Sequence, residues 1–214
     1  ADGIHILKVN GTDDLGNTYT TAQKYTFTKV ARAKYKVALV PGNNFISLPG
    51  APSDPSIDNV LSGTDVSQVL SYQNGAWLLS VKNTATGLFE SADGLVQMNA
   101  SSGYWVTSTT FAPIQVAVPE RNFNVVPPTI NINQGWNMVS VVDAGLRAVG
   151  TGVDEDSYFG SLVNATGGPA WSVAYTFDTT NNAWVKALPG GATTNVEVGK
   201  GYWLWSTIAG TLVP

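Results

Sequence analysis

Short runs in which hydrophobic and polar residues alternate dominate the chain, and turn-forming residues separate them. Residues 25–30 alternate in this way, and residues 66–72 and 172–177 form further runs rich in valine, tyrosine and phenylalanine. Asn74-Gly75 follows one of these runs, and this dipeptide favours a two-residue hairpin turn. Alternation with a period of two, broken by frequent turns, predicts antiparallel β-strands. We therefore expect an all-β fold.

Two short stretches have the spacing of a helix instead. In the first, Ser56 is expected to cap a helix that places Ile57, Val60 and Leu61 on one face. In the second, Asp156 is expected to be the cap. The apolar side chains expected to face inward from this second helix are Tyr158, Phe159, Leu162 and Val163.

A four-residue block occurs twice, as Gly103-Tyr104-Trp105-Val106 and Gly201-Tyr202-Trp203-Leu204. Each copy closes a longer pattern, in which Asn44-Phe45-Ile46-Ser47 corresponds to Asn137-Met138-Val139-Ser140 and Trp77 to Trp184. The correspondences fall in the same order in both halves. We therefore predict two homologous antiparallel β modules, residues 35–122 and 123–214, each with one short helix. The two prolines that end residues 120–128 predict an extended linker between them.

Residues 1–34 predict two strands with a long connection, and such a hairpin is marginal alone in water, so it must pack on something. The segment DGIHILKVNGTDDLGNTYTTAQKYTFTKV resembles the last two strands of bacterial and archaeal Ig-like surface domains. The resemblance implies that the preceding strands of a sandwich are missing. Either the chain is a piece cut inside such a domain, or another subunit supplies the strands by edge pairing.

Residues 35–214 resemble a G-W-N…S…Y…W…G-Y-W repeat of secreted and surface-layer-type proteins of archaea and bacteria. The first copy departs from that pattern at Asn43, where the second copy has the typical tryptophan, Trp136. The second copy also has Val142-Asp143-Ala144 where the first has the Pro49 region. The resemblance implies an extracellular structural or attachment module, and it brings no catalytic residues with it.

The composition narrows the class of protein further. Charged residues make up only 12% of the chain, about half the usual fraction. Such a surface is wetted by Thr, Asn and Ser, as is common in secreted and cell-surface β proteins. The net charge of −4 and the lack of a basic stripe argue against nucleic-acid binding. The absence of cysteine excludes disulfides and thiolate sites.

The sequence also bears on targeting and membrane insertion. No apolar run of about 18 residues is present, so no transmembrane segment is predicted. Ala1-Asp2-Gly3 has the character of the start of a mature or excised piece, because no charged and apolar leader precedes it. We expect a secreted or cell-surface protein.

No catalytic constellation is evident. The single histidine, His5, lies on an alternating strand without a G-x-S-x-G elbow, so we interpret it as an ordinary strand residue. Glycosidic chemistry needs two acids facing each other across a cleft, whereas the acids of this chain cluster in loops. These clusters are Asp13-Asp14, Asp54 with Asp58, and Asp154-Glu155-Asp156. The sequence therefore predicts that the protein is not an enzyme.

Loop oxygens nevertheless suit two other kinds of site. Carboxylates and carbonyls in a loop are ligands for calcium, and Asp13, Asp14 and Asn17 are the best candidates, although their spacing matches no EF-hand. The alternative is that these are solvated turn acids. Three N-x-S/T sequons in expected loops are candidate glycosylation sites. The acceptor residues are Asn10, Asn99 and Asn164.

Seven tryptophans and eight tyrosines raise the question of carbohydrate binding, because aromatic rings stack on sugar faces. Four tryptophans recur at matching places in the two repeats, which favours core or inter-layer packing. These four are Trp77, Trp105, Trp184 and Trp203. Trp171 and Trp205 have no counterpart in the first repeat, so they are the candidates for exposed, ligand-binding residues.

Together these observations favour a non-catalytic structural protein, a building block of a surface layer, sheath or extracellular filament. It would assemble with neighbouring subunits through its β modules and through edge-strand contacts of residues 1–30. The alternative is a cell-surface adhesin or carbohydrate-binding module that uses Trp171 and Trp205.

Overall fold

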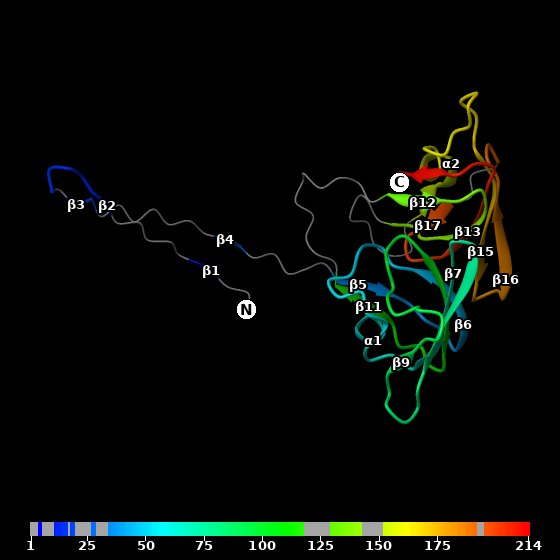
Figure 1. Ribbon diagram of the computed structural model, residues 1–214, viewed down its shortest axis with the longest axis horizontal. Helices are drawn as coiled ribbons and strands as arrows, with labels where there is room; N and C mark the ends of the chain where they lie inside the picture. The colour runs from blue at the N-terminus through cyan, green and yellow to red at the C-terminus, as the bar shows by residue number, and fades with distance from the viewer. Residues whose placement is uncertain are drawn as a thin grey trace. The chain divides into compact units, whose positions relative to one another are not determined.

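The computed structural model describes residues 4–5, 11–16, 18–19, 27–28, 34–117, 129–142, 152–191 and 195–214. The chain divides into two compact units, Ala1–Ala33 and Lys34–Pro214 (Figure 1).

Within its described residues, the N-terminal unit contains two antiparallel strand pairs, one nested inside the other in sequence. Strand β1 (Ile4–His5) pairs with β4 (Phe27–Thr28), and β2 (Gly11–Thr12) pairs with β3 (Thr18–Tyr19). Nested pairs of this kind are the pairing expected of a hairpin with a long connection. What the hairpin packs on stays a prediction.

The first half of the larger unit is built around one antiparallel sheet of strand order β6-β10-β7-β8-β9. A separate pair, β5 with β11, and a single helical turn, α1, accompany the sheet. The bounds are β5 Lys34–Val37, β6 Gly42–Ser47, α1 Ile57–Val60, β7 Val66–Gln73, β8 Ala76–Lys82, β9 Phe89–Glu90, β10 Gly103–Ser108 and β11 Ile114–Ala117.

The second half has the same plan. Its main antiparallel sheet has the order β13-β18-β15-β16, and two further pairs, β12 with β19 and β14 with β17, lie beside it. The bounds are β12 Ile130–Ile132, β13 Gly135–Val139, β14 Gly152–Asp154, α2 Glu155–Tyr158, β15 Trp171–Asp178, β16 Ala183–Ala187, β17 Asn195–Glu197, β18 Tyr202–Ser206 and β19 Gly210–Leu212.

The all-β fold expected from the sequence is confirmed: several antiparallel sheets form a sandwich-like structure, and the two helices of the described residues are one turn each. The order β6-β10-β7-β8 of the first half corresponds to β13-β18-β15-β16 of the second. Each half also has its own cluster of buried apolar residues, one within residues 35–116 and one within residues 130–212. The boundary between the halves falls in residues 118–128, which lie outside the described part.

The hairpin turn at Asn74-Gly75 is confirmed. Strands β7 and β8 pair from Gln73↔Ala76 onward, and both turn residues have positive φ, 52° for Asn74 and 80° for Gly75. Positive φ at both central positions is the geometry of a type I′ turn, whose twist matches that of the flanking strands.

Strand β5 does not form a hairpin with the next strand, although the turn-forming residues Pro41-Gly42-Asn43-Asn44 lie between them. Instead β5 pairs with β11, and β6 pairs with β10. The turn between β5 and β6 is held by the buried Asn44, whose Oδ1 accepts from Val40 N at 2.8 Å. Its Nδ2 donates to the carbonyl oxygens of Val40 and Gly42 at 2.8 and 3.0 Å. The side chain thus supplies the bonds that a partner strand would otherwise make.

Asn137 holds the equivalent turn of the second half in the same way. Its Oδ1 accepts from Asn133 N at 2.8 Å, and its Nδ2 donates to the carbonyls of Asn133 and Gly135 at 2.7 and 3.0 Å. Gly42 and Gly135 occupy matching positions with φ of 99° and 98°. The recurring glycine and asparagine of the sequence pattern are therefore the parts of one turn, used twice.

The helices agree with expectation in their buried faces but not in every cap. Helix α1 buries Ile57, Val60 and Leu61 as expected, although Ser56 at its N-cap makes no side-chain cap bond. For α2 the expected cap, Asp156, is wrong: Asp154 is the N-cap, and its Oδ1 accepts from Ser157 N at 2.8 Å.

The apolar face of α2 also differs from expectation at one residue. Tyr158, Phe159 and Leu162 are buried, whereas Val163 is 49% exposed. The single helical turn ends at Tyr158, five residues before Val163. Helical spacing therefore no longer governs where the side chain of Val163 points.

The two halves interlock through their backbones at the glycines of the repeated block. Ile46 forms a β-bridge with Lys200, and Gly201 N donates to the carbonyl of Phe45 at 3.2 Å. A Cβ at Gly201 would meet the Ile46 carbonyl oxygen at 2.7 Å. In the matching bridge Ser102 pairs with Val139, and a Cβ at Gly103 would lie 3.0 Å from the Val139 carbonyl oxygen. Glycine is needed at both places because the other half approaches so closely.

Two matching serines strengthen this contact. Ser47 Oγ donates to the Lys200 carbonyl at 2.8 Å and accepts from Val141 N at 3.1 Å. Ser140 Oγ donates to the carbonyl of Ala100 in the other direction. Ser47 and Ser140 occupy matching positions, so each half reaches the other with the same serine of the repeat.

No helix in the described part of the chain has the length and apolar character needed to cross a membrane.

Candidate functional site

The alternation along β10 and β18 sends the two aromatic residues of the repeated block to opposite faces of the sheet. Tyr104 and Tyr202 are buried in the two cores, whereas Trp105 and Trp203 point out of the other face and are only half-buried. This outer face of each sheet also carries exposed tryptophans: Trp77 at 49%, Trp184 at 52% and Trp136 at 40% exposure. Strands β6 and β7 of the first half and β15 and β16 of the second lie along the same side of the unit (Figure 1).

The rings of the two halves interleave on this side. Trp105 of the first half lies 5.5 Å from Phe177 and 5.8 Å from Trp184 of the second, between ring centroids. Trp203 of the second half lies 5.3 Å from Tyr72 and 5.4 Å from Trp77 of the first. The two sets of contacts are equivalent, and their tilted and edge-to-face geometries are those that aromatic pairs favour.

An open apolar groove of about 540 Å³ lies among four of these rings, Trp136, Tyr175, Trp184 and Trp203. The ring centroids of neighbouring side chains are 6.2 Å apart for Trp136 and Tyr175, 6.1 Å for Trp136 and Trp203, and 6.4 Å for Tyr175 and Trp184. Its volume falls in the usual range for small-molecule sites, about 300–1,000 Å³. We therefore take this groove as the candidate functional site.

Among the residues that the structure describes, two of the four aromatic walls have no aromatic counterpart at the equivalent place in the first half. Trp136 and Tyr175 are the cross-strand neighbours of Trp205 and Trp203 on β18. At the corresponding positions of the first half, Thr107 pairs with Asn43 and Trp105 pairs with Leu70. The first half therefore lacks two of the four aromatic walls.

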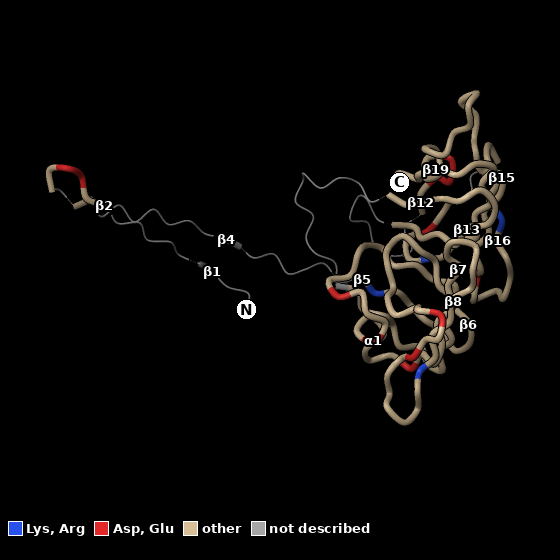
Figure 2. The backbone as a smooth tube through the Cα atoms, in the orientation of Figure 1, with Lys and Arg blue, Asp and Glu red and all other residues tan. Residues whose placement is uncertain are grey.

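Strands β7 and β13, which lie at the junction of the halves, contain no charged residue, and their tubes are tan throughout in Figure 2. None of the four residues that line the groove is charged either. The four lining residues thus offer ring faces and no charge to a ligand, while the exposed Lys186 pairs with Tyr175 across β15 and β16 beside them.

One of the two tryptophans expected to be exposed is buried. Trp171 is only 3% exposed and packs 5.0 Å from Phe159 in the second core. The physical reason is a register shift between Trp171 and Val173, where β15 uses one residue more than β18 and so turns Trp171 inward. Trp205 is exposed, at 37%, and lies 5.2 Å from Trp136 beside the groove.

The four recurring tryptophans were expected to be core or inter-layer residues. The expectation of a core position is wrong, since Trp77 and Trp184 are about half exposed, and Trp105 and Trp203 are not fully buried either. These four side chains pack between the two halves instead. Two features of the sequence could have identified the groove. Alternation along the strands places Trp203 and Trp136 on the outer face of the sheet, and the second repeat has Trp136 where the first has Asn43.

The candidate calcium residues lie at the turn between β2 and β3. Asp13 Oδ1 accepts from Leu15 N at 3.1 Å, and its carbonyl accepts from Gly16 N at 2.9 Å, so this aspartate shapes the turn. Asp14 is exposed, and Asn17 lies outside the described residues. Within the described ranges, no three His, Asp or Glu side chains converge as a metal site would require. A calcium site here stays a prediction.

The other acid clusters act as structural acceptors. Asp54 Oδ1 accepts from Ser56 N at 2.9 Å, and this backbone hydrogen bond lowers the pKa of Asp54. Asp58 Oδ1 accepts from Phe89 N at 2.8 Å, and Asp156 Oδ2 accepts from Gly190 N at 2.8 Å. Each of these carboxylates therefore holds a loop by accepting a backbone hydrogen bond.

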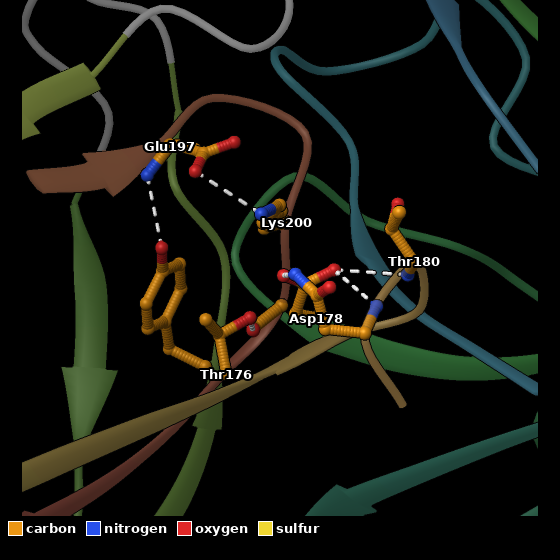
Figure 3. Close-up of polar contacts among 8 residues, drawn as sticks. Thr176, Asp178, Thr180, Glu197 and Lys200 are labelled. Atoms are coloured by element: carbon orange, nitrogen blue, oxygen red, sulfur yellow. Dashed lines mark hydrogen bonds and ion pairs between the residues drawn. The ribbon is translucent and has the colours of Figure 1, made fainter. Parts of the chain in front are cut away.

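A polar cluster at the end of β15 is also structural (Figure 3). Lys200 Nζ lies 3.1 Å from Glu197 Oε1, in an ion pair that is partly exposed. Asp178 holds the β15–β16 turn by accepting from Asn181 Nδ2 at 2.7 Å and from Thr180 N at 2.9 Å. The bonds from Asn181 lower the pKa of Asp178. The adjoining pocket is small, about 90 Å³.

The expected loop position of two sequons is confirmed. Asn99 is exposed in the loop before β10. Asn164 is half-buried in a loop, where its Oδ1 accepts from Thr166 N and Gly168 N at 3.0 and 3.1 Å. Asn10 lies outside the described residues, as does the side chain of His5. Glycosylation stays a prediction.

Comparison with known proteins adds no relative. No protein family, no curated protein and no solved structure matches the chain.

Proposed function

We propose that the chain is a non-catalytic, extracellular binding module whose aromatic groove holds sugar rings of a neutral glycan. The observation that supports this is an open groove walled by four aromatic side chains and by no charged one. The C–H bonds on the face of a sugar ring carry small positive charges, and the face of an aromatic ring is negative, so the two stack favourably. Neutral walls give no advantage to an acidic or basic ligand.

The exposure of the groove favours a ligand that stays partly hydrated. Trp136 and Trp184 keep 40% and 52% of their surface exposed. A wholly apolar ligand would gain most by entering an enclosed cavity, whereas a sugar stacks on one face and keeps its hydroxyl groups in water or in polar contacts. An open platform of rings suits the second kind of ligand.

The proposed lack of catalysis rests on the hydrogen bonds that the aspartate side chains accept. Asp54, Asp58, Asp156 and Asp178 each accept hydrogen bonds from backbone N–H groups of their own or a neighbouring loop. A general base must reach the proton of a substrate, and a glycosidase needs a second acid facing the first. None of these four carboxylates is among the residues that line the aromatic groove.

The test is a screen of neutral and charged glycans, followed by titration of tryptophan fluorescence with the best neutral one. We expect Trp136→Ala to weaken binding by roughly tenfold or more, because it removes one wall of the groove. The control is Phe111→Ala, which removes an aromatic side chain that is 72% exposed and does not line the groove. Binding of no neutral glycan, or equal binding by Trp136→Ala and the wild type, would contradict the proposal.

A second candidate function is a building block of a surface layer, sheath or filament, and the outer edge of β16 favours it. In the first half, β9 covers the equivalent edge of β8 through Val81↔Glu90 and Lys82↔Phe89. No strand of the described residues pairs with that edge of β16, where Val185 is 37% exposed. An unpaired edge is a template for strand addition from another chain.

Light scattering over a range of concentrations tests this second function. We expect a mass that grows with concentration, and a smaller mass for Val185→Asp, which places a charge at the edge of the sheet. A monomer at every concentration would contradict assembly through this edge. The edge contacts expected of residues 1–30 lie mostly outside the described part and stay a prediction.

A further inference from the structure

A second pocket adjoins the aromatic groove at Trp136. This open pocket has a volume of about 360 Å³, and Trp136 belongs to the lining of both. Its walls come from both halves of the unit: Tyr72 and Asn74 from the β7–β8 hairpin, and Asn133 and Gln134 from the turn before β13. The pocket therefore forms only where the two halves meet.

Three side-chain amides at this pocket are available to a ligand. Asn74, Asn133 and Gln134 are exposed, and within the described part none of their side chains makes a hydrogen bond. Asn137, by contrast, is buried and uses both of its side-chain polar atoms inside the turn. Each free amide offers two N–H donors and one carbonyl acceptor without a charge. This is the complement of a group of sugar hydroxyls, which both donate and accept.

At the equivalent place in the first half, the described residues differ from those that line the pocket and the groove. The matching turns, held by Asn44 and Asn137, put Val40 and Pro41 where the second half has Asn133 and Gln134. Neither Val40 nor Pro41 has a side-chain hydrogen-bond donor. The same half also lacks the ring of Trp136. The ring of Trp136 and the amides of Asn133 and Gln134 thus occur together at one of two equivalent places, and the other place has Asn43, Val40 and Pro41 at these positions.

We propose that the amide pocket is a second subsite of the groove, which binds the hydroxyl groups of the sugar next to one stacked on Trp136. The inference rests on the proposed glycan binding and makes it more specific. The ligand is a neutral oligosaccharide of at least two residues, with one ring against the aromatic wall and the next held by Asn133 and Gln134. Affinity then depends on the length of the glycan as well as on its stacking.

The experiment is calorimetric titration of the full chain with neutral oligosaccharides of glucose, mannose and N-acetylglucosamine, from one to six residues. For the wild type we expect affinity to rise from one residue to two or three and then to level off. In Asn133→Ala and Gln134→Ala we expect binding of the longer sugars to fall by roughly three- to tenfold, the effect of a lost hydrogen bond. Binding of the single sugar should stay the same. Gln115→Ala, at an exposed glutamine on β11, is the matched control.

The outcomes separate the two proposals. If longer sugars bind, Trp136→Ala abolishes that binding, and the two amide variants bind every length as the wild type does, the second subsite is wrong and glycan binding stands. If no sugar binds, both are wrong. Binding of a proline-rich peptide in place of any sugar would also overturn both, because such a peptide likewise uses aromatic grooves. Circular dichroism of each variant establishes that it is folded.

Discussion

The indole of Trp105 lies 5.8 Å from the indole of Trp184, at an interplanar angle of 79°, and so joins the first half of the compact unit to the second. Trp203 meets Trp77 in the matching contact, at 5.4 Å and 71°. Together with the β-bridges at Ile46 and Val139, these contacts join the two halves through both side chains and backbone. The two halves should therefore unfold together and not as separate domains.

A double-mutant cycle measures this coupling. We expect Trp105→Ala and Trp184→Ala each to lower the free energy of unfolding by about 2 kcal/mol, since each removes a large apolar side chain that is only partly buried. The double variant should lose about 0.5–1.5 kcal/mol less than the sum, the usual value for an aromatic pair. Urea denaturation of the four proteins gives these values.

The control cycle pairs Trp105→Ala with Trp205→Ala. The ring of Trp205 contacts Trp136 and makes no contact with Trp105. Additive losses in this control, beside non-additive losses in the first cycle, support the interlock. Two separate unfolding transitions in the wild type would contradict it.

Gly201 tests the close approach of the two backbones. A Cβ there would lie 2.7 Å from the Ile46 carbonyl oxygen and 2.6 Å from the Phe45 ring. We expect Gly201→Ala to lower the free energy of unfolding by about 1–3 kcal/mol, as overpacking does. Gly210→Ala is the matched control, because a Cβ at Gly210 would meet its nearest atom at 3.9 Å. Equal stability of the two variants in urea would show that the halves do not pack as described.

Much of the fold could be predicted from alternation and turn chemistry alone. Asn74-Gly75 forms its type I′ turn, and Ile57, Val60 and Leu61 are buried as their spacing indicates. These features depend on neighbours in sequence. The pairing of β5 with β11 does not, because it joins residues nearly eighty positions apart, and nothing local distinguishes it from the hairpin with β6.

The candidate site was predictable only in part, for two physical reasons. A bulge in β15 moves the side chain of Trp171 from the outer to the inner face of the sheet. A bulge of this kind cannot be recognised reliably in a single sequence. The recurrence of Trp77 and Trp184 suggested a core, because residues kept in two repeats commonly pack. Here they pack on the other repeat, at the edge of an open groove, and that contact exists only once the halves are placed together.

The hydrogen bonds of Asn44 to its turn lead to a separate prediction. Asn44 makes three hydrogen bonds to the backbone of its turn, and it is buried. We expect Asn44→Ala to lower the free energy of unfolding by about 2–4 kcal/mol, because it leaves buried backbone groups without partners. Asn43→Ala, at the exposed neighbour that bonds only Thr107 Oγ1, should change stability by less than about 0.5 kcal/mol. Thermal and urea denaturation measure the stability of both variants. A similar loss in the two would refute the role of Asn44 in holding the turn.

The buried tyrosines predict a loss of stability in alkali. Burial raises the pKa of Tyr104 to about 12 and raises the pKa values of Tyr158 and Tyr202 as well. In the unfolded chain a tyrosine ionises near pH 10, so above that pH the folded state holds protons that the unfolded state has lost. Stability should be constant in this respect below about pH 10 and fall as the pH rises toward 12. For Tyr104 the loss is on the order of 2–3 kcal/mol.

Tyr104→Phe isolates this effect. The phenol donates to the Asn99 carbonyl at 3.2 Å and accepts from Asn99 N at 2.6 Å, so the variant should be less stable than the wild type at pH 8. Its stability should then decline less steeply above pH 10, because phenylalanine cannot ionise, and the two curves should converge. Urea midpoints at several pH values from 8 to 11.5 measure the convergence. Parallel curves would show that the ionisation of Tyr104 is not linked to folding.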